Sequence, residues 1–349
     1  MDNTVKNILL IFLLVLIFYL MSVLSSLLIP LVLAFLCASL FQPLVRKLHK
    51  VKAPDWLIMP IIIIITLGIF YGLLNIIIQT GTQISAQQNY LLQRLEIKVD
   101  GLFEWINSVF ALHLTVGNIF SELSENISSQ WISSTAGGIA SSIGSFTGSF
   151  LMFALYYIVL LAGMANFDEY ISYVGGDNKT SLMENAHKIQ DSIFKYMLIK
   201  AIISISTGFF VYFICLLFGI KFAVLWAFLT IILNFIPSIG SVISTIPPVL
   251  MAIIQFDGIQ SAFILLLCLI IVQFLIGNII EPKIMGGRLK LNTLTVIFGL
   301  VFWGYLWGIP GMILSVPMMV LLKLLFEHSP SLNIVARIMG SPEKKRKLE

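Results

Sequence analysis

Residues 234–253, with the sequence NFIPSIGSVISTIPPVLMAI, decide how this chain must fold. They lie inside an apolar run, 222–256, yet they contain three prolines and a glycine. Proline removes a backbone donor and clashes with the preceding helical turn, and hydrocarbon offers no replacement partner for the freed backbone groups. The run therefore cannot be a lipid-facing helix throughout. Its broken backbone must be buried in protein or line a water-filled cavity.

Composition places the whole chain in a membrane. The 349 residues are 58% hydrophobic and 11% charged, whereas soluble domains carry about 25% charged residues. A bilayer core needs about 20 apolar residues per helix, and six runs meet or approach that length: 8–28, 31–48, 56–78, 139–164, 199–219 and 259–280. We expect an all-α polytopic membrane protein with about six full transmembrane helices.

Two further apolar runs, 222–256 and 293–326, are too long for one crossing and too short for two. Each is split centrally, by NFIPSIG and by WGIPG respectively. Their length predicts two broken re-entrant helical hairpins, which brings the total to about eight hydrophobic segments.

Basic residues set the expected orientation. The loop RKLHKVK (46–52), the loop KIMGGRLKL (283–291) and the terminal EKKRKLE are rich in lysine and arginine, which favours the cytoplasm. The long segment 79–138 carries few basic residues and suits the outside. Both termini are therefore predicted to be cytoplasmic.

The two broken runs share a loose pattern. One contains Ile236, Pro237, Gly240, Ser244 and Pro247, and the other contains Ile309, Pro310, Gly311, Ser315 and Pro317. Each follows a full span, and the two spans are expected to cross in opposite directions. A span plus a hairpin, repeated upside down, is the inverted repeat of many secondary transporters, whose solutes bind where broken helices meet. The alternative is coincidence, because proline and glycine are common in membrane helices.

Amphipathic stretches separate the spans. Leu92, Leu95, Val99, Leu102, Ile106 and Val109 recur at steps of three and four residues, which predicts a helix with a coiled-coil-like seam. It would pack against sister subunits, lie on the membrane, or fold back on residues 116–131. A second stripe, from Met183 to Met197, is expected to lie along the cytoplasmic membrane surface. The chain then divides into 1–78, 79–138, 139–198, a transport core at 199–328, and a basic tail at 329–349.

Polar side chains inside apolar runs are the candidate functional residues, because hydrocarbon penalises them. Asn234 would contact a solute or bond carbonyls freed by Pro237. Gln273 and Asn278 are five residues apart and so are not expected to share a tight helical face, and they suggest interhelical hydrogen bonds or ligand contacts. Glu281 would carry a coupling proton or mark the end of its span. Lys200 is expected to reach the membrane surface, and Asp257 to cap a helix in a turn.

Catalytic signatures are missing from the sequence. It contains no HExxH, GxSxG or Walker motif. The four histidines are scattered, and the three cysteines lack paired spacing. We therefore expect no enzyme, metal site, cofactor or nucleic-acid partner.

Longer motifs make the chain resemble a known family. LLIPLVLAFLCASLFQPLV, KYMLIKAIISISTG, LWAFLTIILNFIPSIGSVISTIPPVLMAI and GNIIEPKIMGGRLKLNTLTVIFGLVFWGYLWGIPGMILSVPMMVLLK are similar to the autoinducer-2 exporter family, in its branch that transports the quorum signal. The similarity covers about residues 20–328, and the paired NFIPSIGS and EPKIMG motifs are its most distinctive part.

The resemblance implies export of autoinducer-2, a small polar signal, by a secondary or passive route, in a homo-oligomer of the bacterial inner membrane. The residues expected to contact the solute are Asn234, Pro237, Gly240, Ser244, Pro247, Gln273, Asn278, Gly308, Pro310, Gly311 and Ser315, with Glu281 in a coupling role. We expect the solute to sit between the two breaks, around Pro237 and Pro310. Sodium or proton antiport is the first alternative, because some relatives are linked to it, and a non-transporting membrane scaffold is the second.

Overall fold

A computed structural model describes residues 3–50, 54–110, 148–163, 172–173, 179–237, 239–285, 291–327, 329 and 332–340. In this part of the chain the structure is helical throughout, with one isolated β-bridge between Leu291 and Gly340. The prediction of an all-α membrane protein is confirmed. The first part of the predicted fourth span, 139–147, and the segment 116–131 lie outside the described residues.

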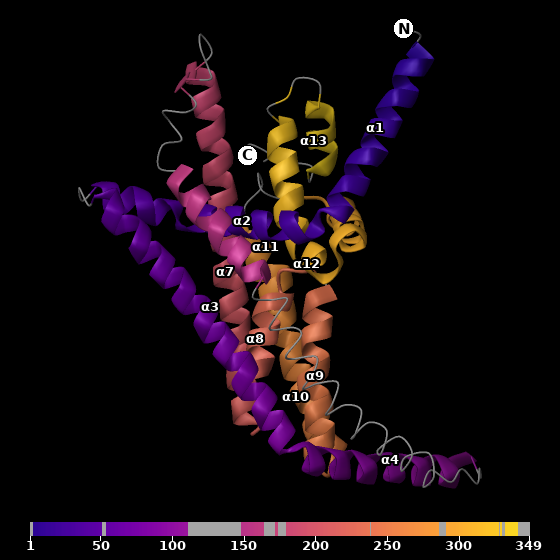
Figure 1. The fold of residues 1–349 in the computed structure, drawn as a ribbon. Helices are drawn as coiled ribbons and strands as arrows, with labels where there is room; N and C mark the ends of the chain where they lie inside the picture. Colours follow the sequence, from indigo (N-terminus) through magenta and orange to yellow (C-terminus); the bar gives the residue numbers. More distant parts are fainter. Residues whose placement is uncertain are drawn as a thin grey trace, which may run out of the picture.

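Figure 1 shows the described helices in order along the chain. Their bounds are α1 (Asn3–Val23), α2 (Ser25–Lys50), α3 (Asp55–Ala86), α4 (Gln88–Phe110), an unlabelled helix Gly148–Gly163, α7 (Lys179–Leu217), α8 (Ala223–Leu233), α9 (Ile239–Gln255), α10 (Ile259–Phe274), the π-helix η2 (Leu275–Ile280), α11 (Glu281–Met285), α12 (Thr293–Glu327) and α13 (Asn333–Met339).

Five described helices are long and apolar enough to cross a membrane: Thr4–Val23, Leu57–Ala86, Met183–Leu217, Ile259–Met285 and Thr293–Glu327. The span predicted at 31–48 is not among them. Ser25–Phe41 of α2 is described as a shorter apolar helix, so a full span at 31–48 stays a prediction. In Figure 1, α2 runs across the direction of α7 rather than alongside it.

Helix α7 corrects a second expectation. The amphipathic stripe from Met183 to Met197 does not form a separate helix on the membrane surface. It continues directly into the span, as one helix from Lys179 to Leu217. The physical reason is that no glycine or proline interrupts the sequence between Lys179 and Gly208, so nothing ends the helix there.

The first broken run forms two packed helices. Helix α8 ends at Leu233, residues 234–237 form a turn that contains Pro237, and α9 begins at Ile239. The two helices pack against each other, against α7 through α8 and against α10 through α9. The break predicted from NFIPSIG is therefore where the helix stops.

The second broken run doubles back in the same way. Helix α12 has one non-helical residue, Gly308, with φ 64° and ψ −143°. That combination is accessible mainly to glycine. Beyond it the chain returns along itself, so that Gly304 faces Met312 and Gly299 faces Met319.

The two breaks share a local construction. A Cβ added to Gly240 would overlap the carbonyl oxygen of Leu233, and one added to Gly311 would overlap that of Trp303. Four residues after each glycine a buried serine bonds the carbonyl three residues before it: Ser244 Oγ donates to Ser241 O at 3.1 Å, and Ser315 Oγ to Met312 O at 2.7 Å. In both turns, therefore, the glycine permits a close approach to a backbone carbonyl, and the serine four residues later bonds another carbonyl.

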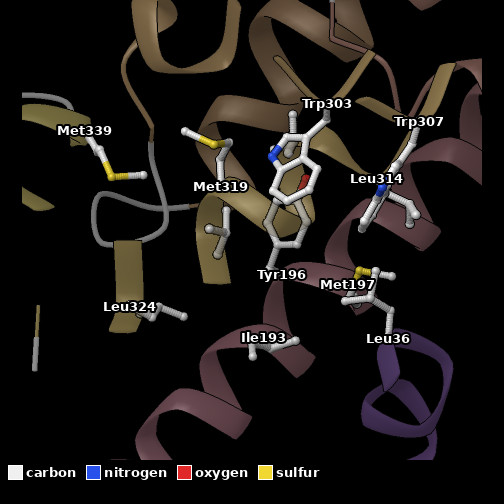
Figure 2. Close-up of a cluster of buried hydrophobic side chains, with 12 residues drawn as sticks. Leu36, Ile193, Tyr196, Met197, Trp303, Trp307, Leu314, Met319, Leu324 and Met339 are labelled. Atoms are coloured by element: carbon white, nitrogen blue, oxygen red, sulfur yellow. The ribbon is translucent and has the colours of Figure 1, made fainter. Parts of the chain in front are cut away.

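Three apolar clusters hold the helices together. The largest joins α2, α7, α12 and α13, with Trp303, Trp307, Tyr196 and Met319 at its centre (Figure 2). A second joins α7, α9 and α10 around Cys215. A third joins α2, α3 and the helix Gly148–Gly163. The first two clusters include residues of α7 that lie before and after the polar region described below.

Helix α4 lies at one end of the molecule, whereas α13 and the start of α1 lie toward the other (Figure 1). Polar contacts attach it to the loops at that end. Arg94 Nη1 donates to Asp257 Oδ1 at 2.7 Å, and Lys98 Nζ donates to the Asp257 carbonyl at 2.9 Å. Lys221 Nζ lies 3.9 Å from the centre of the Tyr90 ring. Asp257 is 87% exposed. It binds Arg94 and Lys98 of α4, and its side chain does not cap a helix.

We expect the Asp257→Asn substitution to loosen the docking of α4 without unfolding the protein. Hydrogen bonds to Tyr90 and then to Asp257 raise the pKa of Arg94, so Arg94 keeps its charge at any working pH and the contact depends on Asp257 and on salt. Hydrogen exchange of residues 88–100 should rise at least about twofold, as for other weak exposed pairs. Exchange equal to that of the parent protein would show that the other contacts, among them Lys98 with the carbonyl of residue 257, hold α4 without the Arg94–Asp257 ion pair.

Candidate functional site

A polar cavity of about 360 Å³ lies where α7, the α8–α9 turn and the α10–η2–α11 helix meet. This volume is in the range of small-molecule sites. Its lining consists of Lys200, Asn234, Ile236, Pro237, Ser241, Gln273, Gly277, Asn278 and Glu281. Five of the predicted site residues are among them: Asn234, Pro237, Gln273, Asn278 and Glu281.

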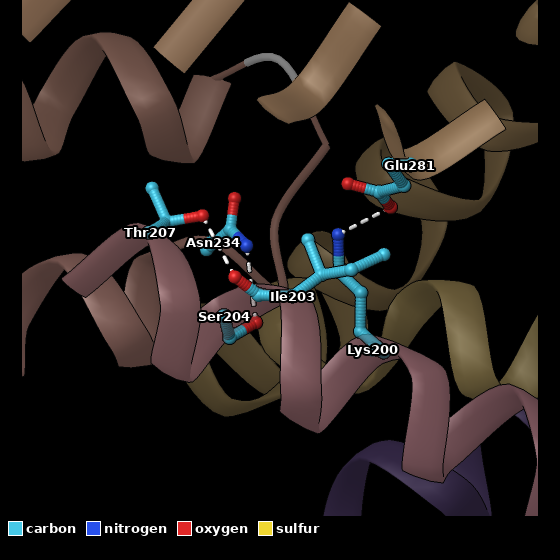
Figure 3. Close-up of polar contacts among 6 residues, drawn as sticks. All are labelled: Lys200, Ile203, Ser204, Thr207, Asn234 and Glu281. Carbon is cyan, nitrogen blue, oxygen red and sulfur yellow. Dashed lines mark hydrogen bonds and ion pairs between the residues drawn. The ribbon is translucent and has the colours of Figure 1, made fainter. Parts of the chain in front are cut away.

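The α8–α9 turn supplies one wall because the sequence prevents a helix there. Pro237 has no backbone N–H, and Gly240 lets the start of α9 approach the Leu233 carbonyl closely. The Asn234 amide then donates from Nδ2 to Ser204 Oγ on α7 at 3.0 Å (Figure 3). Both residues are buried. Asn234 therefore fixes the turn to α7 and still borders the cavity.

The π-helix η2 supplies the opposite wall. Gln273 and Asn278 are five residues apart, which in an α-helix would separate their directions by about 140°. A π-helix pairs residues i and i+5, so this segment brings both amides to the cavity. Gln273 is also held from α9, because its Nε2 donates to Ser244 Oγ at 3.1 Å. The expectation that Gln273 and Asn278 share no face assumed α-helical spacing and is wrong here.

Lys200 and Glu281 form an ion pair across the cavity (Figure 3). Lys200 Nζ lies 2.6 Å from Glu281 Oε1, and the two side chains are only 4% and 18% exposed. The prediction that Lys200 reaches the membrane surface is therefore wrong. Burying two charges is costly, and a pair kept in this way is stable only while both partners remain.

A sequence signal for Lys200 exists, although the sequence reading missed it. Tyr196, Lys200, Ser204 and Thr207 recur at intervals of four, four and three residues along α7. This spacing places them on one helical face, and all four are buried. A polar stripe on an apolar span predicts a face turned toward protein rather than lipid.

The other predicted residues lie elsewhere. Gly240, Ser244 and Pro247 belong to α9, next to the cavity wall but outside its lining. Gly308, Pro310, Gly311 and Ser315 surround the second break, which does not border this cavity. That break packs beside α1, where Trp307 Nε1 donates to Met21 O at 2.9 Å. As solute contacts these residues stay a prediction, and the structure does not bring the two breaks together at one cavity.

The chemistry of the cavity is that of recognition. Three amide side chains offer donors and acceptors, one ammonium and one carboxylate balance each other, and prolyl and glycyl backbone lies beside them. Among the described residues, no group of three or more His, Cys, Asp or Glu side chains is placed to hold a metal ion. The arrangement can bind a small polar solute through hydrogen bonds.

A multi-pass α-helical chain with a solute-sized polar cavity at a broken helix belongs to the class of membrane transport proteins. The sequence comparison agrees, since residues 7–331 match the family described as AI-2E family transporter. The chain belongs to this transporter family.

Individual relatives differ in how much they share with the chain. A Haemophilus influenzae protein classed with transport proteins is 29% identical over 317 residues, 89% of each chain. The Escherichia coli K12 "AI-2 transport protein TqsA" is 37% identical over 154 residues, which is 44% of each chain. YhhT of the same strain, also classed with transport proteins, is 35% identical over 162 residues, 46% of each chain. The chain therefore aligns with under half of the relative that has a named solute.

Proposed function

We propose that this protein exports autoinducer-2 across the bacterial inner membrane by a secondary or passive route, and that the cavity beside the first break binds the solute. The observation that carries the proposal is the cavity itself, which combines a solute-sized volume with amide and charged groups inside an apolar fold. The similarity to TqsA supports the choice of solute. Broken helices near a binding site are also a common design in secondary transporters.

The proposed orientation has both termini in the cytoplasm. The start of α1 and α13 lie toward one end of the molecule and α4 toward the other (Figure 1), in keeping with the basic loops. We further propose the lipid bilayer and additional copies of this chain as partners. In support, α1 carries a continuous apolar surface that no described part of the chain covers.

The amide of Asn278 allows a direct test, because no described residue bonds it and it borders the cavity. In bacteria lacking their own exporter, expression should lower the ratio of internal to external autoinducer-2. Asn278→Leu should weaken transport about three- to tenfold, the value of one or two lost hydrogen bonds. Asn75→Leu is the matched control, because Asn75 is a half-buried amide outside the cavity whose described bond, to Tyr71 O, lies within α3.

An unchanged ratio with correctly inserted protein would contradict autoinducer-2 export. Ion antiport is then the second candidate, because Glu281 is a carboxylate inside the cavity and such groups serve as ion relays. Asp257 does not support that candidate, because it is exposed and bonded to Arg94. Sodium-dependent proton flux in liposomes, lost in Glu281→Gln, would establish antiport.

A further inference from the structure

We propose that Lys200 is a positioning residue, which through Glu281 holds Leu275–Ile280 in π-helical form and thereby selects the side chains that the cavity presents. This inference rests on the proposed function, in that the cavity is taken as the solute site. It assigns Lys200 and η2 roles that no motif of the chain indicated.

The π-helix is the feature that needs an explanation. Such segments are rare and recur at functional sites. Here the π-helical turn has one direct effect, which is to place Gln273 and Asn278 on the same cavity. In α-helical form, Asn278 would turn away from the cavity by a large fraction of a turn, and everything that follows it, including Glu281, would turn with it.

Two bonds to neighbouring helices flank the π-helical turn. Before it, Gln273 donates to Ser244 on α9 at 3.1 Å. After it, Glu281 accepts from Lys200 on α7 at 2.6 Å. Both bonds join the α10–η2–α11 helix to its neighbours, through Gln273 to α9 and through Glu281 to α7. They are compatible with each other only while the six residues of η2, which lie between them, keep the π-helical form.

The Glu281 contact is the stronger of the two, because a charge-assisted hydrogen bond exceeds a neutral one. Its charges are also buried, so separating them leaves an unpaired ion in the fold. Pro282 offers a competing explanation. A proline cannot bond the carbonyl four residues before it, here that of Asn278, and it disfavours a regular α-helix at this point. The experiment must therefore separate Lys200 from Pro282.

The ion pair also couples solute binding to the helical form of η2. The ammonium of Lys200 has three donors, and within the described chain Glu281 Oε1 is its one hydrogen-bond partner. An oxygen-bearing solute in the cavity can compete with Glu281 for Lys200. Whatever weakens the pair then favours the α-helical form, in which Asn278 leaves the site, so solute occupancy and helix form shift each other's populations.

The test measures the direction of residue 278 and does not depend on transport. Asn278→Cys is placed in purified protein whose three native cysteines are replaced by alanine, reconstituted in liposomes, and treated with a small charged thiosulfonate. Labelling should be fast, because the site faces the cavity. In a Lys200→Met/Glu281→Gln background, which leaves no unpaired charge, labelling should slow at least about tenfold if the π form becomes a minor state.

Three further variants make the outcome decisive. Deleting Ile279 removes the extra residue and should slow labelling equally. Exchanging the charges, as Lys200→Glu/Glu281→Lys, should restore labelling. Unchanged labelling in the neutral double variant, with loss on deletion of Ile279 or in Pro282→Ala, would overturn the inference and assign the π-helical form to Pro282.

Autoinducer-2 flux is measured on the same proteins. Labelling as expected without any flux in the parent protein would reject the proposed solute and leave the role of Lys200 standing.

Discussion

Replacing Gly240 or Gly311 by alanine is expected to cost most of the stability of the protein. In both positions the added methyl group would overlap a backbone carbonyl oxygen, that of Leu233 or that of Trp303. A carbonyl in a packed helix cannot swing aside as a flexible side chain can. Overpacking of this kind costs about 1–3 kcal/mol when side chains yield, and we expect more than about 4 kcal/mol here, at the extreme of single substitutions.

The measurement is thermal unfolding in detergent, together with the yield of folded protein. Gly72→Ala is the control, because Gly72 lies within helix α3 and no atom lies within 4 Å of the position its methyl would take. There we expect a neutral effect or a gain of up to about 1 kcal/mol from improved helix propensity. Equal behaviour of Gly240→Ala and Gly72→Ala would mean that α8 and α9 do not approach as described.

Lys200→Met is expected to destabilise the protein by about 3–5 kcal/mol and to abolish transport, because it leaves the Glu281 carboxylate buried without its partner. Glu281 keeps slight access to water, which favours the lower end of this range. The double variant Lys200→Met/Glu281→Gln should regain most of the stability, because neither charge remains to be buried.

The matched control lies on the same helix. Lys188 pairs with Glu184 at 3.7 Å, and both side chains are largely exposed. Lys188→Met should change the free energy of unfolding by no more than about 0.5 kcal/mol. Chemical unfolding of the four proteins gives the comparison. A double variant as unstable as Lys200→Met would indicate that the lysine stem, and not its charge, stabilises this region.

The sequence predicted the breaks in the two long apolar runs, because the evidence for them is local. Pro237, Gly240 and Gly308 impose backbone geometry wherever the chain folds. The same holds for the predicted interior position of Asn234, since an amide in an apolar run must find protein or water. These features do not depend on what packs against them.

Other features depend on contacts between distant segments, and for that reason the sequence reading missed them. Lys200 was expected at the surface because a lone lysine in a span usually reaches for water, and its partner lies 81 residues away. Gln273 and Asn278 were expected to diverge because spacing arguments assume an α-helix, and the π-helix interrupts that period. The second break shares its sequence pattern with the first but packs beside α1, which no local pattern reveals.

The length of α7 has a mechanical consequence. It is one uninterrupted helix of 39 residues, or about 58 Å at 1.5 Å per residue, roughly twice the hydrocarbon thickness of a bilayer. Lys200 lies near its middle, and the half before it runs toward the end of the molecule where α13 and the start of α1 lie (Figure 1). Because the helix is uninterrupted, a small tilt at its centre displaces its end by a larger distance. We therefore expect a change at the ion pair to move the stretch from Lys179 to Gln190, which lies on the cytoplasmic side in the proposed orientation.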